Sequence, residues 1–262
     1  MISADAGIHP SAVVDPDARI EPGVRIGPFV VIGAGVEIAA GTRIGPHTVI
    51  EGPTRIGRDN TIHAHVVLGG EPQDKKYRDQ PTRLEIGDGN TIREFVTVNR
   101  GTAEDEGITR IGDDNWIMAY VHIAHDCVVG NHTIFANAAS LAGHCRVEDY
   151  AILGGFSLIH QFCQVGAHAF TAMGSVISRD VPPFVTVAGP YAAPHGINSE
   201  GLKRRGYDSA RIMAIKRAYR TLYKSGLPLA EARQQLADAA DSTPDIRQLL
   251  DFIDRSKRSL IR

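Results

Sequence analysis

An aliphatic residue recurs every six positions between residues 8 and 68, and this period restricts what the chain can fold into. The residue four places after each of these is small or of modest size, and turn-forming Gly, Pro, Asp and Asn fill many positions between. An α-helix needs a period of about 3.6 residues, so the pattern does not describe a helix. The recurring positions are Ile8, Val14, Ile20, Ile26, Ile32, Ile38, Ile44, Ile50, Ile56, Ile62 and Leu68.

Two inward positions in each hexad, with a turn after every short strand, predict a parallel β-helix in which three hexads make one coil. Residues 18 apart in the sequence should then stack about 4.8 Å from one another. The pattern resumes at Ile86 and Ile111, after excursions near residues 69–85 and 100–110, and it ends at Ile177. We therefore expect a mainly β domain over residues 1–190 and an α-helical domain over residues 191–262.

The cysteines test this stacking, because Cys127, Cys145 and Cys163 are spaced 18 residues apart and all take the small inward position. We interpret them as a buried stack rather than a metal or redox site. So few cysteines in a chain of 262 residues fit a reducing compartment. A net charge of −2 gives no global basic field for nucleic acid, and no run of roughly 18 apolar residues predicts a membrane span. We expect a cytoplasmic protein.

Helical periodicity replaces the hexads from about residue 191. Asp208 or Ser209 can cap a helix that ends before Gly226, and two further amphipathic helices are predicted in LAEARQQLADAADS and PDIRQLLDFIDRSKRSL. These helices could cover the end of the prism and its open strand edge. Cations concentrate here, either as a solvated helix face or as a site for an acidic partner: Lys203, Arg204, Arg205, Arg211, Lys216, Arg217, Arg220 and Lys224.

One corner of the predicted prism gathers groups suited to acid–base chemistry. His125 and Asp126 lie in one turn, Gly143 and Gln161 take the position of His125 in the next two coils, and His144 stacks on Asp126. A carboxylate beside a histidine can fix its tautomer and raise its basicity, which favours a general base. The backbone N–H at Gly143 could stabilise an oxyanion. The corner is therefore a candidate acid–base site.

Two more histidines, His122 and His160, project from strand positions near this corner. Zinc is an alternative, because the γ-type carbonic anhydrases, also hexapeptide prisms, bind zinc through three histidines, two of them 36 residues apart and two of them five apart. His132 and His168 are 36 apart, but the third ligand would fall at Met173, and no two histidines are five apart. We therefore predict that no metal is bound.

Six motifs beyond the repeats are QDKKYRDQPTRLEIGDGNTIRE, VHIAHDCVVGNH, LAGHCRVED, HQFCQVGAHAF, DVPP and INSEGLKRRGY. With them the chain resembles the UDP-N-acetylglucosamine O-acyltransferases, the first enzymes of lipid A synthesis, over essentially its whole length. The resemblance implies a left-handed prism and a homotrimer with its clefts between subunits. It also implies transfer of a (3R)-3-hydroxyacyl group from acyl carrier protein to the 3-hydroxyl of UDP-N-acetylglucosamine, without a cofactor.

The resemblance also assigns roles to residues. It makes His125 the general base, Asp126 its orienting group and the Gly143 amide the oxyanion donor. It implies that Lys216, Arg217 and Arg220 face the acidic carrier protein. The substrate-binding residues that it implies are Gln73, Asp74, Lys76, His122, His144, His160, Gln161, Asn198, Glu200, Arg204 and Arg205.

Two positions concern the length of the acyl chain. In the family, the residue at the position of Met173 sets the depth of the acyl pocket, and position 191, here Tyr191, is also linked to depth. A methionine side chain fills the space of several methylenes, so we predict a donor of ten to twelve carbons. Two other classes stay open: a non-catalytic prism that binds a sugar nucleotide or scaffolds partners, and an acetyl-CoA-dependent acetyltransferase.

Overall fold

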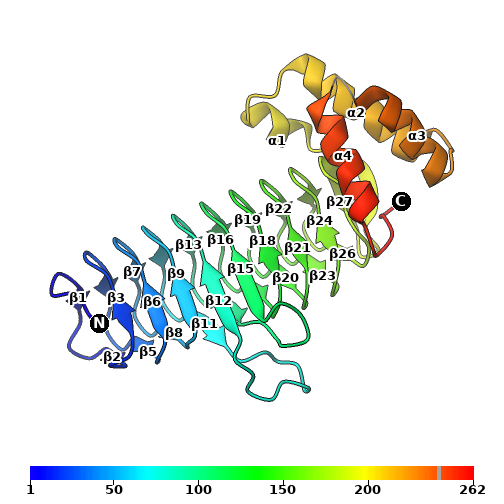
Figure 1. The fold of residues 1–262 in the computed structure, drawn as a ribbon. Helices are drawn as coiled ribbons and strands as arrows, with labels where there is room; N and C mark the ends of the chain where they lie inside the picture. The colour runs from blue at the N-terminus through cyan, green and yellow to red at the C-terminus, as the bar shows by residue number, and fades with distance from the viewer. Residues whose placement is uncertain (241–242) are drawn as a thin grey trace.

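The computed structural model describes residues 1–240 and 243–262, and it contains a three-sided parallel β-helix with helices at its C-terminal end (Figure 1). The eleven-stranded sheet contains β1 (Gly7–Ile8), β4 (Arg25–Ile26), β7 (Arg43–Ile44), β10 (Thr61–Ile62), β13 (Thr91–Ile92), β16 (Trp116–Ile117), β19 (Ile134–Phe135), β22 (Ile152–Leu153), β25 (Phe170–Thr171), β27 (Val185–Ala188) and β28 (Ala193–Ile197). The nine-stranded sheet contains β2 (Val13–Val14), β5 (Val31–Ile32), β8 (Val49–Ile50), β11 (Val67–Gly70), β14 (Thr97–Asn99), β17 (His122–Ile123), β20 (Ser140–Leu141), β23 (Leu158–Ile159) and β26 (Val176–Ile177). The eight-stranded sheet contains β3 (Arg19–Ile20), β6 (Val36–Ile38), β9 (Thr54–Ile56), β12 (Arg83–Ile86), β15 (Ile108–Ile111), β18 (Val128–Val129), β21 (Arg146–Val147) and β24 (Gln164–Val165).

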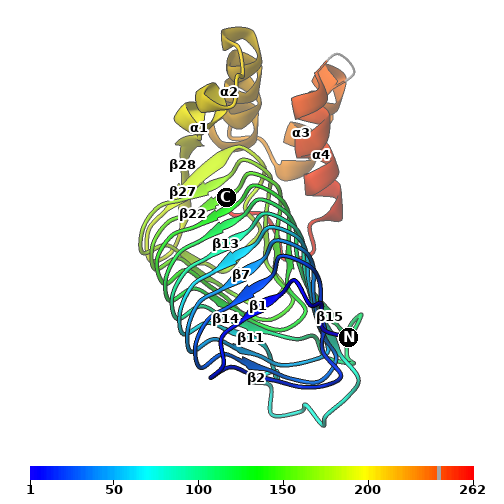
Figure 2. The same cartoon turned by 90° about the vertical axis from the view of Figure 1, so that its left-hand side faces the viewer.

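The register confirms the predicted prism of three hexads to a coil, whose three-sided section is visible in Figure 2. The prism is left-handed, as the resemblance implied. His122 pairs with Ser140, which pairs with Leu158, so residues 18 apart stack within one sheet. The recurring aliphatic side chains from Ile20 to Leu68 are buried inside. Cys127, Cys145 and Cys163 are also buried and free, and burial raises the pKa of the Cys163 thiol to about 12. These thiols therefore pack as small apolar groups.

Most corners turn through one residue with a positive φ, such as His144 at 61° and Phe162 at 65°. Because this residue occurs at the same place in each coil, its side chains stack along a corner. His144 and Phe162 stack with ring centroids 4.5 Å apart. A longer ladder runs along another corner through Phe29, His47, His65, Phe95 and Tyr120.

A column of buried polar side chains lies inside the prism beside the eleven-stranded sheet. The backbone N–H of Asn60 donates to Thr42 Oγ1 (3.1 Å), and that of Asn90 donates to Asn60 Oδ1 (2.9 Å). Asn115 and Thr133 continue the column, each donating its N–H to the asparagine side chain before it at 2.9 and 2.8 Å. Each coil is thereby tied to the next from within.

The two excursions are shorter than predicted, because β11 runs to Gly70, β12 begins at Arg83 and β15 begins at Ile108. The loops therefore cover residues 71–82 and 100–107. Both leave the nine-stranded sheet and enter the eight-stranded sheet, so they project from one edge of the prism (Figure 1).

The tail begins with a hairpin that the sequence did not predict, since β28 pairs antiparallel with β27 beyond residue 190. The helices are α1 (Ser199–Arg204), α2 (Ser209–Lys224), α3 (Leu229–Ala240) and α4 (Pro244–Arg255). Asp208 caps α2 as predicted, accepting from the N–H of Arg211 at 2.8 Å. The last two residues of LAEARQQLADAADS, 241 and 242, lie outside the described part of the chain. No helix in the described residues is both long and apolar enough to cross a bilayer.

Prediction of a helix through PDIRQLLDFIDRSKRSL was wrong for its last residues, because α4 ends at Arg255. Ser256 takes an extended conformation with ψ 124°, and its hydroxyl donates to the buried carboxylate of Asp180 at 2.6 Å. This bond draws the C-terminal segment, residues 256–262, back onto the end of the prism.

Candidate active site

The candidate site lies on the edge between the nine-stranded and eight-stranded sheets. We call this edge the histidine corner; it consists of the successive turns 125–126, 143–144 and 161–162. The loops 71–82 and 100–107 leave the prism along the same edge, in coils closer to the N-terminus. Five predicted residues therefore lie on one edge, beside two loops: His125, Asp126, Gly143, His144 and Gln161.

His125 and Asp126 form the predicted pair, with Nδ1 of the histidine 2.9 Å from Oδ2 of the aspartate. Thr102 also binds this carboxylate, donating its backbone N–H to Oδ1 (2.9 Å) and its hydroxyl to Oδ2 (2.6 Å). Burial raises the pKa of Asp126, but the hydrogen bonds from His125 and Thr102 outweigh it and hold the pKa below its usual value. An ionised Asp126 accepts a hydrogen bond from the N–H at Nδ1 of His125, which leaves Nε2 as the basic nitrogen of the ring.

Only 2% of the Asp126 side chain is exposed, although Asp126 lies in a turn at the edge of the prism. Loop 100–107 folds over the turn and covers the carboxylate through Thr102. The six-residue period placed the turns but gave no information on how an excursion folds back. One signal was available: the second excursion leaves the prism in the coil next to His125.

Gly143 is required by the close approach of the His125 ring. A Cβ atom at Gly143 would lie 2.5 Å from Cε1 and 2.7 Å from Nε2 of His125. The backbone N–H of Gly143 donates no hydrogen bond to any residue in the described part of the chain. An unused N–H beside a basic nitrogen is the arrangement that an oxyanion intermediate needs.

His144 forms the wall of the site above Asp126. Its Nδ1 lies 2.9 Å from Asp105 Oδ2, and its Nε2 lies 3.8 Å from Asp126 Oδ2. Its ring meets the ring of His125 edge to face, with the centroids 5.1 Å apart. Asp105 belongs to loop 100–107 and was not predicted, so this loop orients both histidines.

His122 and His160 flank the corner. His122 Nδ1 lies 2.8 Å from Thr97 Oγ1, and burial, together with the nearby His125, lowers the pKa of His122. A neutral imidazole suits hydrogen bonding to a sugar hydroxyl. His160 is exposed, and its Nδ1 lies 3.4 Å from Nη2 of Arg258, a residue of the C-terminal segment that was not predicted.

The first excursion carries Gln73, Asp74 and Lys76 from the same edge. Asp74 Oδ1 accepts from the N–H of Lys76 at 3.0 Å, and Lys76 Nζ reaches Glu104 of the second excursion at 3.5 Å. The two loops are therefore in contact beside the corner. No hydrogen bond joins Gln73 or Asp74 to His125 within the described residues.

The predicted substrate-binding residues of the tail lie at a different corner of the same chain. Arg205 stacks on Tyr150, with its guanidinium carbon 4.3 Å from the ring centroid, and Asn198 donates to the carbonyl of His168 at 3.0 Å. Burial lowers the pKa of His168 to about 4. Glu200 pairs with Lys203 at 2.8 Å, and Arg204 lies at the end of α1. A single chain does not bring these residues to His125.

The predicted acyl-length residues lie at the third corner. Met173 is 78% exposed and Tyr191 94% exposed, so neither is enclosed within one chain. Tyr191 lies in the turn of the β27–β28 hairpin. The N–H of its neighbour Ala192 donates to the carbonyl of Val176. Lys216, Arg217 and Arg220 are exposed on α2, and none has an ion-pair partner within the described residues.

His125, Asp126 and His144 each present one potential metal-ligand atom, and these atoms lie within 4.8 Å of one another. Among described residues this is the one cluster of that kind. Both Asp126 oxygens already accept hydrogen bonds from Thr102, which suits a hydrogen-bonded base better than a metal site. Metal-free chemistry stays a prediction.

Known acyltransferases share both the sequence and the fold of this chain. A model of domain 2 of UDP N-acetylglucosamine O-acyltransferase matches residues 180–261, and a bacterial transferase hexapeptide model matches residues 5–40, 35–70 and 108–143. An acyl-[acyl-carrier-protein]–UDP-N-acetylglucosamine O-acyltransferase of Janthinobacterium sp. is 58% identical over 97% of this chain and 99% of its own. The structure of the Moraxella catarrhalis UDP-N-acetylglucosamine O-acyltransferase is 42% identical, with a TM-score of 0.95 over 97% of this chain and 99% of its own. The structure of the Francisella novicida UDP-N-acetylglucosamine acyltransferase is 39% identical, with a TM-score of 0.90 over 100% of this chain and 94% of its own.

Proposed function

Since this chain belongs to the UDP-N-acetylglucosamine O-acyltransferase family and is an acyl-carrier-protein-dependent O-acyltransferase, we propose that the histidine corner performs the transfer. The reaction is the first step of lipid A synthesis. The proposed donor is a (3R)-3-hydroxyacyl thioester of acyl carrier protein, and the proposed acceptor is the 3-hydroxyl of UDP-N-acetylglucosamine. One observation carries the proposal: His125 is hydrogen-bonded to a buried carboxylate on one side and lies against Gly143, whose N–H is free within the described residues, on the other.

The groups of the corner account for each proton and each bond. Nε2 of His125 removes the proton from the sugar hydroxyl as its oxygen attacks the thioester carbonyl, and Asp126 stabilises the resulting imidazolium. The carbonyl oxygen becomes an oxyanion beside the N–H of Gly143. When the intermediate collapses, the carbon–sulfur bond breaks and the leaving sulfur takes the proton from His125. The products are the O-acylated sugar nucleotide and the free thiol of the carrier protein.

Incubation of the protein with UDP-N-acetylglucosamine and 3-hydroxydecanoyl carrier protein tests this function. We expect an O-acylated sugar nucleotide by mass spectrometry, and none when acetyl-CoA replaces the donor. Lys216, Arg217 and Arg220 would attract the acidic carrier protein, so the KM for the donor should rise with salt more than the KM for the acceptor. A binding scaffold would give no product with either donor, and an acetyltransferase would use acetyl-CoA.

We propose a homotrimer because the single chain leaves its predicted site residues divided among three corners. The outward positions of the nine-stranded sheet carry exposed apolar side chains, including Val31 at 41% and Leu158 at 49%. A second subunit against this face would cover them and bring a different corner to His125. Sedimentation equilibrium should give three times the chain mass of 28.3 kDa, and a monomer would contradict this arrangement. A cytoplasmic location and the lack of a cofactor stay predictions.

We propose that Met173 limits the donor to ten to twelve carbons. Its side chain stands at the corner where the acyl chain is expected, with Cγ 4.0 Å from where a Cβ atom on Gly155, in the coil before it, would lie. In Met173→Gly the lost side chain opens room for several methylenes, so kcat/KM should shift by tenfold or more toward fourteen-carbon donors, on the order of 1 kcal/mol for each buried methylene. A series of carrier-protein donors measures this. An unchanged chain-length profile would refute the assignment.

A further inference from the structure

The C-terminal segment, residues 256–262, is fixed to the end of the prism by Asp180, which is fully buried. The N–H of Asp180 donates to the carbonyl of Ser259, and the N–H of Ile261 donates to the carbonyl of Asp180, both at 2.9 Å. The carboxylate of Asp180 accepts from the Ser256 hydroxyl at 2.6 Å. Leu260 and Ile261 are buried, so the segment between these anchors has a defined path.

This path brings Arg258 to the C-terminal end of the histidine corner, where the series of backbone hydrogen bonds between successive turns ends. In the coils below, the N–H of His144 donates to the carbonyl of His125 (3.0 Å), and the N–H of Phe162 donates to that of Gly143 (3.1 Å). The next carbonyl in this series belongs to Gln161, and it accepts from Nη2 of Arg258 at 3.3 Å. A side chain from the tail thus replaces the backbone donor of the missing coil.

Arg258 also continues the ring stack of the corner. Its guanidinium carbon lies 5.7 Å from the centroid of Phe162, which itself stacks on His144. The same Nη2 lies 3.4 Å from Nδ1 of His160, and that nitrogen also lies 3.3 Å from the Gln161 carbonyl oxygen. Arg258 therefore contacts both His160 and the main chain of Gln161.

We propose that Arg258 is a positioning residue for the acceptor: it ends the histidine corner, fixes the main chain at Gln161 and holds the ring of His160 in place. This proposal rests on the proposed function, in which Gln161 and His160 contact UDP-N-acetylglucosamine. Arg258 acts through these two residues and takes no proton from the substrate. The C-terminal segment is therefore part of the site, although it lies far from the histidines in the sequence.

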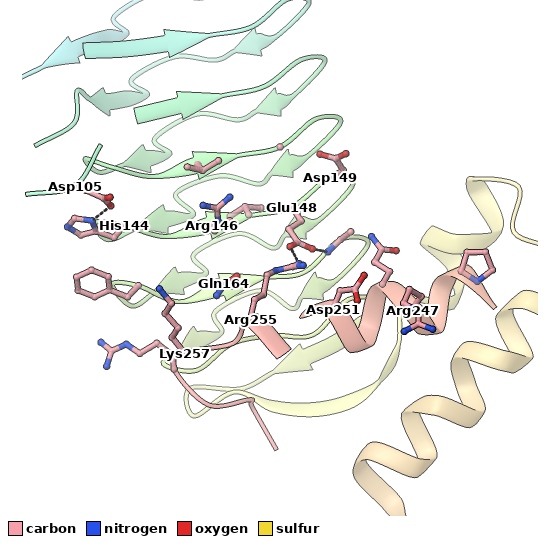
Figure 3. A pocket seen from close by; sticks show the side chains of 18 residues that line it. Asp105, His144, Arg146, Glu148, Asp149, Gln164, Arg247, Asp251, Arg255 and Lys257 are labelled. Carbon is pink, nitrogen blue, oxygen red and sulfur yellow. Dashed lines mark hydrogen bonds and ion pairs between the residues drawn. The ribbon is translucent and has the colours of Figure 1, made fainter. Parts of the chain in front are cut away.

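The neighbouring Lys257 provides a matched control. It carries the same charge on the same segment and lines the groove between the eight-stranded sheet and α4, near His144 (Figure 3). It makes no hydrogen bond or ion pair within the described residues. Lys257→Gln therefore removes one positive charge from the groove without removing a hydrogen bond or ion pair, whereas Arg258→Gln removes the charge together with the hydrogen bonds.

The test compares Arg258→Gln, Arg258→Lys and Lys257→Gln in the full chain, with kcat and KM measured for both substrates. Loss of a charged hydrogen bond that positions the site should weaken acceptor binding roughly tenfold. Arg258→Gln should therefore raise the KM for UDP-N-acetylglucosamine about tenfold and leave kcat within about threefold. Calorimetric titration with UDP-N-acetylglucosamine should show the same loss of affinity. Arg258→Lys should recover part of it, and Lys257→Gln should match the unmodified chain.

Several results would overturn the proposal: no change in acceptor KM, an equal change in Lys257→Gln, or a rise only in the KM for the carrier-protein donor. A fall in kcat alone, with a lowered Tm and unchanged affinity for the acceptor, would show a merely structural role. If Arg258→Gln does not fold, Arg258→Lys still decides, because a lysine keeps the charge but cannot reproduce the forked geometry. Failure of the proposed function is distinguishable, since the unmodified chain would then form no product.

Discussion

His125→Ala is expected to lower kcat by roughly 10²- to 10⁴-fold, because the sugar hydroxyl loses its positioned base. Asp126 would keep both hydrogen bonds from Thr102, so the turn should stay in place. The affinity for UDP-N-acetylglucosamine, measured by calorimetry, should change far less than kcat. Steady-state rates with the 3-hydroxydecanoyl donor give the comparison.

His9→Ala is the control for this substitution. His9 lies in the first coil, and among the described residues its Nδ1 lies 2.9 Å from the hydroxyl of Ser11 and accepts from the N–H of Ser11 at 3.2 Å. The activity of the His9→Ala variant should equal that of the unmodified chain. If His125→Ala keeps full activity while it remains folded, His125 is not the base and the mechanism fails.

Gly143→Ala should reduce kcat by roughly 10²- to 10³-fold, although it adds a single methyl group. That methyl would lie 2.5 Å from Cε1 of His125, so the ring must move away from the position set by Asp126. The base and the oxyanion donor would then no longer face one reacting carbon. Single-turnover rates, with a crystal structure of the variant, measure the loss and the displacement together.

Gly33→Ala offers a matched control, since a Cβ there meets its nearest neighbour at 3.4 Å, an ordinary contact. Its activity should be unchanged. A Gly143→Ala variant with normal rates and an unmoved His125 would show that the close approach of His125 to Gly143 does not contribute to catalysis.

The sequence predicted the prism well because one physical rule repeats in every coil: an aliphatic side chain points inward every six residues. The same rule placed Cys127, Cys145 and Cys163 inside, and His125, Gly143 and Gln161 on one edge. Periodicity says nothing of segments that leave it.

The residues missed belong to those segments. Thr102 and Asp105 lie in an excursion, and their contacts with Asp126 and His144 depend on how that loop folds back. The β28 strand contains Pro194 and Gly196, so it lacks the alternation of a strand. Arg258 follows α4 in a stretch where the amphipathic pattern predicts more helix, but the chain leaves the helix and Ser256 binds the buried Asp180. Each depends on a long-range contact that local sequence does not encode.

The buried asparagine column solves a problem that hexad repeats create. Every hexad resembles the next, so a coil displaced by one hexad would still bury aliphatic side chains, on the wrong side of the triangle. The amide of Asn90 donates to Asn60 Oδ1 at 3.0 Å, and a coil displaced by one hexad would place Val96 against Asn60 and remove this bond. These residues thus distinguish one side of the prism from the other two. Through them the interior sets which edge His125 occupies.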